Sequence, residues 1–124
     1  MHKYYNPNPQ AARVGDCVIR AVSFATGQSW EKTYLDLCVY GLIYCDLPSS
    51  NGVWSRYLLD KGFRRYIVPD TCPSCYTVRQ FTEDHPKGEY ILAISGHVVA
   101  VKDGNHYDTW DSSDEVVVYY WMKE

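Results

Sequence analysis

A cysteine and a histidine of this sequence have the setting of a nucleophile and its base. Cys17 follows Gly15 and Asp16 at the start of a predicted helix. Free backbone N–H groups and the helix dipole favour a thiolate at that position. His97 opens a predicted strand directly after Gly96, which leaves room for another element to approach closely. A thiolate beside an imidazole attacks carbonyl carbon, so this pair indicates nucleophilic acyl chemistry.

An acid that orients the imidazole is expected on the strand that returns from His97. Asp103-Gly104 predicts a two-residue hairpin turn. Such a turn sets Val99 opposite Asp108, so that Asp108 lies diagonal to His97 on one face of the hairpin. A one-residue bulge at the turn would instead set Asp111 opposite His97. Asp108 is therefore the first candidate for the orienting acid, and Asp111 is the alternative.

These motifs, in this order, resemble the papain-like cysteine peptidase superfamily. A Cys that starts a helix, a His that opens a hairpin and Asp108-Thr109-Trp110 are similar to its Cys and His–Asn-Ser-Trp segments. Compact bacterial members, including bacteriocin-processing peptidases, use Asp in place of the Asn. The segment 15–21 also resembles small proteins of Gram-positive bacteria and their phages. The resemblance implies one α+β domain over residues 1–124, with N-terminal helices packed on a C-terminal antiparallel β-sheet.

The same resemblance implies a role for each residue. Cys17 would attack the substrate carbonyl, His97 would act as base and then acid, and Asp108 would orient His97, with Trp110 shielding that contact from water. Papain-like enzymes usually carry a Gln six residues before the Cys as an oxyanion donor. Ala11 occupies that position here, so the amide of Gln10, or of the nearby Asn8, is expected to take the role.

The leading hypothesis is a small cysteine hydrolase that cleaves a peptide or isopeptide bond in a peptide or protein substrate. It needs no metal and no cofactor, because the thiolate and the imidazole supply the chemistry. Two alternatives stay open. One is a catalytically silent papain-like fold that serves as a binding module. The other is a Cys-His-Asp acyltransferase, because the sequence does not distinguish water from an amine as the acceptor.

Composition narrows the class of protein further. The chain has 124 residues, 46% of them hydrophobic, and a formal net charge of −3. This size suits one domain with its own core, and the acidic balance argues against non-specific binding of nucleic acid. The sequence has no apolar stretch of about 18 residues that could cross a membrane, and residues 1–7 lack the apolar core of a signal peptide. We therefore expect a cytoplasmic protein without nucleic-acid or membrane partners.

Five cysteines, an odd number, argue against a disulfide framework in a chain without an export signal. Four are expected to be structural thiols, and Cys17 the reactive one. Cys72 and Cys75 have the spacing of half a zinc site or of a redox pair, and stay open as a pair. A zinc site would need further ligands. Cys45 or His85 would supply one only if the fold brought it close to Cys72 and Cys75.

Periodicity and turn residues predict the other elements. Asp16 and Ser29 are the expected N-caps of helices over 17–26 and 30–44, and shorter helices are expected over 53–61 and 77–84. The strands are expected over 63–68, 89–95, 97–101, 106–110 and 115–121. The apolar stripe expected to face the core from the second helix is Tyr34, Leu37, Cys38, Gly41 and Leu42.

The remaining segments are expected to be irregular. Residues 1–15 are interpreted as an extended lead-in, and Pro69-Asp70 as a turn that closes a strand. The loop over 46–52 and Trp54 are expected to border the cleft. His106 adjoins the hairpin turn and is interpreted as a surface residue.

Overall fold

Helices and a six-stranded mixed sheet make up the computed structural model, which describes residues 1–69 and 72–123. The helices are α1 (Cys17–Thr26), α2 (Trp30–Ile43), α3 (Asn51–Asp60) and α4 (Val78–Asp84). The strands are β1 (His2–Tyr4), β2 (Phe63–Ile67), β3 (Glu89–Ile94), β4 (His97–Lys102), β5 (Asn105–Asp108) and β6 (Val117–Lys123). This is the α+β class that the sequence predicted. Among the described residues, no helix is both long and apolar enough to span a membrane.

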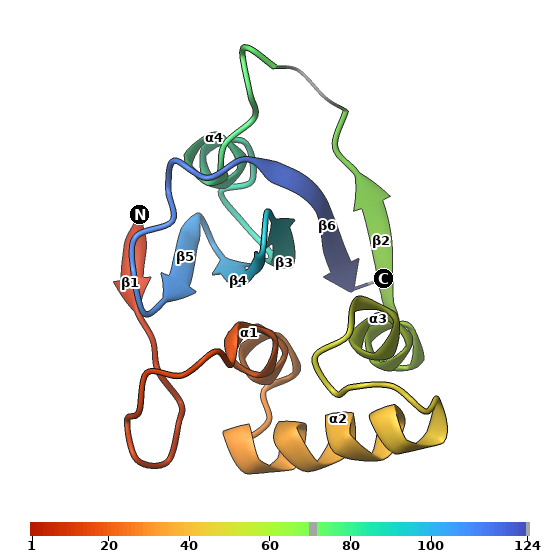
Figure 1. The fold of residues 1–124 in the computed structure, drawn as a ribbon. Helices are drawn as coiled ribbons and strands as arrows, with labels where there is room; N and C mark the ends of the chain where they lie inside the picture. The colour runs from red at the N-terminus through yellow and green to blue at the C-terminus, as the bar shows by residue number, and fades with distance from the viewer. Residues whose placement is uncertain (70–71, 124) are drawn as a thin grey trace.

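The sheet is buried on both faces, with the strand order β1-β5-β4-β3-β6-β2. Figure 1 shows α1, α2 and α3 on one side of it and α4 on the other. Alternate residues of β4 enter different cores, because successive side chains of a strand point to opposite faces. Val98 and Ala100 join the core that contains α1, whereas Val99 and Val101 join the core that contains α4. The start of β4 is thereby held firmly against α1.

The first strand was not expected, and it makes the sheet mixed. β1 pairs in parallel with β5, with His2 opposite His106. The prediction of an antiparallel sheet is therefore wrong at this edge. The prediction that His106 is a surface residue is also wrong, because this side chain is 1% exposed. Three residues form too short a segment for a sequence pattern, and the free edge of β5 induces the strand by offering unpaired backbone groups.

The hairpin of β4 and β5 has the predicted turn. Asp103 and Gly104 both have positive φ angles, of 50° and 80°, as a two-residue type I′ turn requires. Val101 lies opposite His106 in the resulting register, which sets Asp108 diagonal to His97. The local chemistry of one turn thus brings two residues that are eleven positions apart to the same end of the hairpin.

Helix α2 differs from its predicted orientation. Leu37 is fully buried and Gly41 is buried, as expected, but Tyr34 is 44% exposed and Leu42 is 80% exposed. The buried face is instead Thr33, Leu37 and Gly41. Gly41 is required there, because a Cβ atom at this position would lie 2.7 Å from the carbonyl oxygen of Asp46. Apolar residues surround the whole of α2, so their spacing alone did not show which side faces the core.

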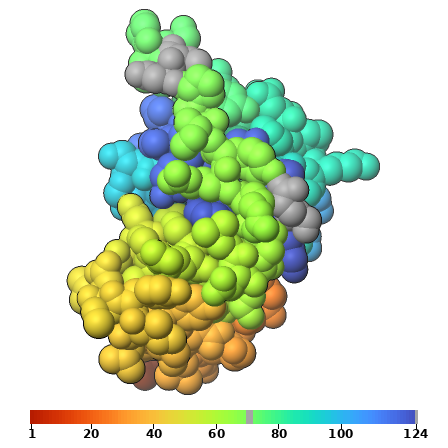
Figure 2. All heavy atoms as spheres, turned by 90° about the vertical axis from the view of Figure 1, so that its right-hand side faces the viewer, coloured from red at the N-terminus to blue at the C-terminus, as the bar shows by residue number. Residues whose placement is uncertain are grey.

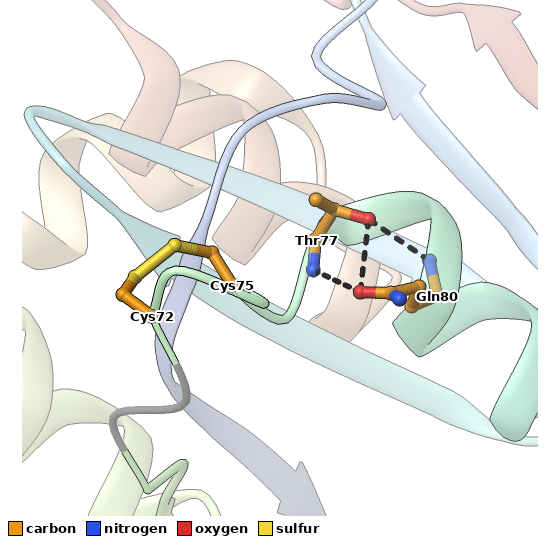
Figure 3. Close-up of a disulfide and its surroundings, with 4 residues drawn as sticks. All are labelled: Cys72, Cys75, Thr77 and Gln80. Carbon is orange, nitrogen blue, oxygen red and sulfur yellow. Dashed lines mark hydrogen bonds between the residues drawn. A yellow bond between two sulfur atoms is a disulfide. The ribbon is translucent and has the colours of Figure 1, made fainter.

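Cys72 and Cys75 form a disulfide, which corrects the expectation of reduced thiols at these positions. Figure 3 shows the bridge next to the start of α4, where Thr77 and Gln80 form a capping box. The two sulfur atoms are bonded to each other, so neither is free to bind zinc. In the part of the chain that the structure describes, no group of three or more His, Cys, Asp or Glu side chains could hold a metal ion. The predicted Pro69-Asp70 turn includes Asp70, which lies outside the described residues.

Candidate active site

Cys17, His97 and Asp108 come together where the first turn of α1 faces the start of β4 and the end of β5. Nε2 of His97 lies 2.5 Å from Oδ2 of Asp108. A carboxylate can only accept, so this nitrogen donates. The thiol of Cys17 is hydrogen-bonded to the ring of His97 and to the backbone N–H of Val98. Because Asp108 occupies Nε2, the ring nitrogen that remains for the sulfur is Nδ1.

The carboxylate of Asp108 is fully buried and has four hydrogen-bond donors. Besides His97, these are the backbone N–H of Thr109 at 2.7 Å, Nη2 of Arg20 at 3.1 Å and the hydroxyl of Ser112 at 3.2 Å. Burial raises the pKa of Asp108, but the hydrogen bond from His97, the charge of His97, the Thr109 N–H and Arg20 outweigh it. The pKa is therefore lowered, and the carboxylate stays ionised.

Arg20 joins this carboxylate to a second buried acid, a contact that sequence reasoning missed. Its guanidinium is hydrogen-bonded to Asp16 as well as to Asp108, and the arginine is 5% exposed. The indole N–H of Trp30 donates to the other oxygen of Asp16 at 2.9 Å. Asp16 occupies the predicted N-cap position of α1, but its side chain makes no capping hydrogen bond. It faces Arg20 one helical turn away instead, as i,i+4 spacing allows.

The surroundings of His97 and Cys17 shift both pKa values toward an ion pair. Burial lowers the pKa of His97, but hydrogen bonds and charge interactions with Asp108 and Cys17 raise it to about 9. Burial raises the pKa of Cys17, but the hydrogen bonds from His97 and Val98 and the charges of His97 and Arg20 lower it overall. Between these two pKa values, the favoured state is a thiolate beside an imidazolium.

Trp110 lies against the imidazole, with 4.9 Å between the two ring centroids. This is the position that the family resemblance implied for the shielding tryptophan. Asp111, the alternative orienting acid, does not reach His97. Its carboxylate accepts from the backbone N–H of Ser113 at 3.0 Å and lies 3.3 Å from Nε2 of His106. The hairpin has no bulge at its turn, and the condition that would have favoured Asp111 is therefore absent.

A cavity of about 320 Å³ opens onto Cys17 and His97. Ser49, Asn51 and Trp54 border it on one side, as the sequence suggested for this loop and for Trp54. The other walls come from the start of α1, the β3–β4 turn and β6. Apart from His97, the described residues that line this cavity carry no charged side chain. The cavity therefore suits an uncharged chain segment with a carbonyl group next to the sulfur.

The structure does not bring either predicted amide to this cavity. Gln10 is exposed, and Oδ1 of Asn8 accepts from the backbone N–H groups of Gln10 at 2.9 Å and Ala12 at 3.3 Å. These bonds close a turn in which Ala11 has a φ of 54°. The segment is thus folded on itself. The spacing from Cys17 predicts an oxyanion donor at Gln10 or Asn8 only if this segment runs directly into α1. The turn prevents that.

Asn51 is the amide that does line the cavity, at the first position of α3. Its Oδ1 accepts the indole N–H of Trp54 at 3.1 Å, and Trp54 is fully buried. This bond leaves Nδ2 as a donor that has no partner among residues 1–69 and 72–123. The sequence placed Asn51 in the loop expected to border the cleft but did not indicate its amide as a donor, because that depends on how α3 packs against α2 and β2.

Known proteins offer no independent guide to this site. Protein-family models, curated proteins and solved structures were all compared with the chain, and none of them matches it. The chemistry of the side chains around Cys17 is therefore the basis for assigning a function.

Proposed function

We propose that the protein is a papain-like cysteine hydrolase that cleaves a peptide or isopeptide bond. The observation that carries this proposal is the chain of hydrogen bonds from Cys17 through His97 to the buried carboxylate of Asp108. The order of elements supports it, because the cysteine starts a helix and the histidine opens a hairpin on the adjacent sheet. A cavity next to the sulfur, whose described lining carries no other charged side chain than the Cys17 and His97 pair, provides room for a peptide.

The proposed reaction has two stages. The Cys17 thiolate attacks the carbonyl carbon, and the electron pair of the C=O bond moves to the oxygen. The backbone N–H of Cys17 lies at the first position of α1, where no intrahelical acceptor exists, and donates to this oxyanion. When the oxyanion collapses, the C–N bond breaks and the His97 imidazolium protonates the leaving amine. His97 then takes a proton from water, which attacks the thioester and releases the acid and the Cys17 thiolate.

Selective alkylation of Cys17 is the expected result that tests this proposal. Iodoacetamide at pH 7 should label Cys17 at least about 10-fold faster than Cys38 or Cys45, because only Cys17 has an imidazole partner. Peptide mapping by mass spectrometry after timed labelling measures the three rates. The labelling rate should rise with pH around a midpoint below that of an ordinary thiol, since the pKa of Cys17 is lowered.

Turnover of a peptide library should fall as the pH passes about 9. Above the raised pKa of His97, the imidazolium loses the proton that the leaving amine needs. Cys17→Ala is the control for both measurements. Faster labelling of Cys38 or Cys45 would contradict the assignment of the nucleophile. Selective labelling of Cys17 without any hydrolysis would favour an acyltransferase over a hydrolase.

Asn51 is the proposed second donor to the oxyanion. Asn51→Asp keeps an oxygen for the indole N–H of Trp54 but removes the free Nδ2 donor. We expect kcat/KM for a peptide substrate to fall by about 10²-fold, as when an oxyanion-hole donor is removed. The rate of Cys17 alkylation should change less than 3-fold, on the order of a weak electrostatic effect. Gln10→Glu is the matched control, and a larger loss in that variant would restore Gln10 as the donor.

A further inference from the structure

The outward side of α2 exposes more apolar surface than a helix of this composition usually shows to water. Leu35, Val39, Leu42 and Ile43 are between 53% and 80% exposed. Leu47, directly after the helix, is 70% exposed. Figure 2 shows the segment around residues 30–50, in orange to yellow, at the lower end of the molecule. A helix that is apolar on all sides is normally covered on all sides, so this face needs a partner.

The exposed Leu35 and Leu42 and the half-buried Cys38 have the spacing of a helix-pairing seam. Leu35, Cys38 and Leu42 recur at intervals of three and four, which is the a/d pattern of a coiled coil. Val39 lies beside them on the same side. We call these four residues the outer stripe of α2. The face of α2 that packs inside the protein lies opposite, at Thr33, Leu37 and Gly41.

The outer stripe of α2 is complementary to itself when two copies run antiparallel. A two-fold axis between Cys38 and Val39 sets Leu35 of one copy opposite the partner's Leu42, and the same pair recurs on the other side of the axis. Tyr34 and Ile43, which are 44% and 63% exposed, border the stripe on its two opposite edges. Such an isologous contact is the commonest way in which identical chains associate.

The amount of apolar surface and its charges favour a second copy over a membrane. Seven neighbouring apolar side chains on α2 and just after it are at least 43% exposed: Tyr34, Leu35, Val39, Leu42, Ile43, Tyr44 and Leu47. Together they expose several hundred Å², on the scale of the roughly 800 Å² that each partner buries in a standard interface. Helices that lie on membranes carry Lys and Arg on their polar face. The one cation of α2, Lys32, is paired with Asp36 at 2.8 Å.

We propose that the outer stripe of α2 is the interface of an antiparallel homodimer. The stripe lies on a different element from Cys17, His97 and Asp108. A test of the dimer is therefore independent of a test of the proposed hydrolase activity.

Sedimentation velocity over a range of about 1 to 500 μM tests the dimer. The wild-type chain should pass from monomer to dimer within this range. Leu42→Glu should raise the dissociation constant by about 100-fold or more, because the symmetry places each substitution in the interface twice. The side chain of Leu42 is 80% exposed, so this variant should fold normally. Ile67→Glu is the matched control, since Ile67 is 67% exposed on β2, and its dissociation constant should not change.

Leu35→Lys combined with Leu42→Glu tests the orientation of the two helices. The antiparallel arrangement sets Leu35 opposite the partner's Leu42, so the added lysine should recover part of the dimer that Leu42→Glu alone loses, more at low salt than at high salt. A wild-type chain that stays monomeric would overturn the proposal. A dimer that is insensitive to Leu42→Glu would overturn it as well. Binding of the monomer to phospholipid vesicles, abolished by Leu42→Glu, would assign the stripe to a membrane instead. A double variant that recovers none of the lost dimer would overturn the antiparallel orientation.

Discussion

Asp108→Asn is expected to lower the turnover of a peptide substrate by about 10⁴-fold, the loss typical of an amide in place of the orienting acid. All four groups around this carboxylate are donors, and an asparagine would direct its own NH₂ group toward some of them. The hydrogen bond and charge of Asp108 also raise the pKa of His97. Without them, only the contacts with Cys17 still oppose burial, so this pKa should fall and less of the imidazolium that pairs with the Cys17 thiolate should remain at pH 7.

Two measurements on folded protein check this expectation. The rate of Cys17 alkylation at pH 7 should fall by at least about 10-fold, and the midpoint of its rise with pH should move upward. Asp111→Asn is the matched control, because Asp111 is an exposed acid three positions away that contacts Ser113 and not His97. It should leave both values unchanged. An Asp108→Asn variant that kept the wild-type alkylation profile would exclude Asp108 from the site.

The same pair of groups contributes to the pH dependence of the stability of the wild-type fold. The pKa of His97 is raised to about 9 from an ordinary 6.5. Its contribution to the free energy of unfolding is therefore fully present below pH 6.5 and is lost as the pH rises through about 9. The pKa of Asp108 is lowered from 3.8. Its contribution is therefore present above 3.8 and is lost as the pH falls through the lowered value. Asp108→Asn should remove the contribution of Asp108 and reduce that of His97, so the dependence of unfolding free energy on pH should become flatter.

The parts of the site that local chemistry determines were predictable from the sequence. Asp103 and Gly104 specify one type of turn, and this turn fixes the register that places Asp108 diagonal to His97. The αL residue Gly27 that ends the helix starting at Cys17 also follows from a local preference. These features need no information about distant segments.

Features that depend on packing between distant segments were not predictable. The pairing of β1 with β5 and the burial of His106 arise from residues about a hundred positions apart. The contact of Arg20 with Asp108 spans 88 positions. The amide of Asn51 was not indicated as a donor, because that depends on how α3 packs against α2 and β2. A sequence pattern records the preferences of one segment, so it shows that a side chain is apolar or charged but not which partner it meets.

Arg20→Met is expected to lower the free energy of unfolding by about 3–5 kcal/mol at pH 7, because breaking a buried ion pair leaves uncompensated charges. Asp16 and Asp108 would both remain in the core without the guanidinium between them. Urea unfolding followed by circular dichroism measures the change. Arg79→Met is the matched control. Arg79 pairs with Asp114 at the surface, with both side chains more than half exposed, so the loss there should be under about 1 kcal/mol. Equal losses in the two variants would contradict a buried network.

Arg20 should also act on the thiol, which a purely structural residue would not do. Its charge lowers the pKa of Cys17, so the midpoint of alkylation against pH should move upward in Arg20→Met. Arg20→Lys keeps the charge but loses the planar fork that joins two carboxylates. It should therefore retain much of the wild-type midpoint while losing stability. Asp16→Asn combined with Arg20→Met should recover part of the stability, since one buried charge is gone, but not the midpoint. An unchanged midpoint in folded Arg20→Met would limit Arg20 to a structural role.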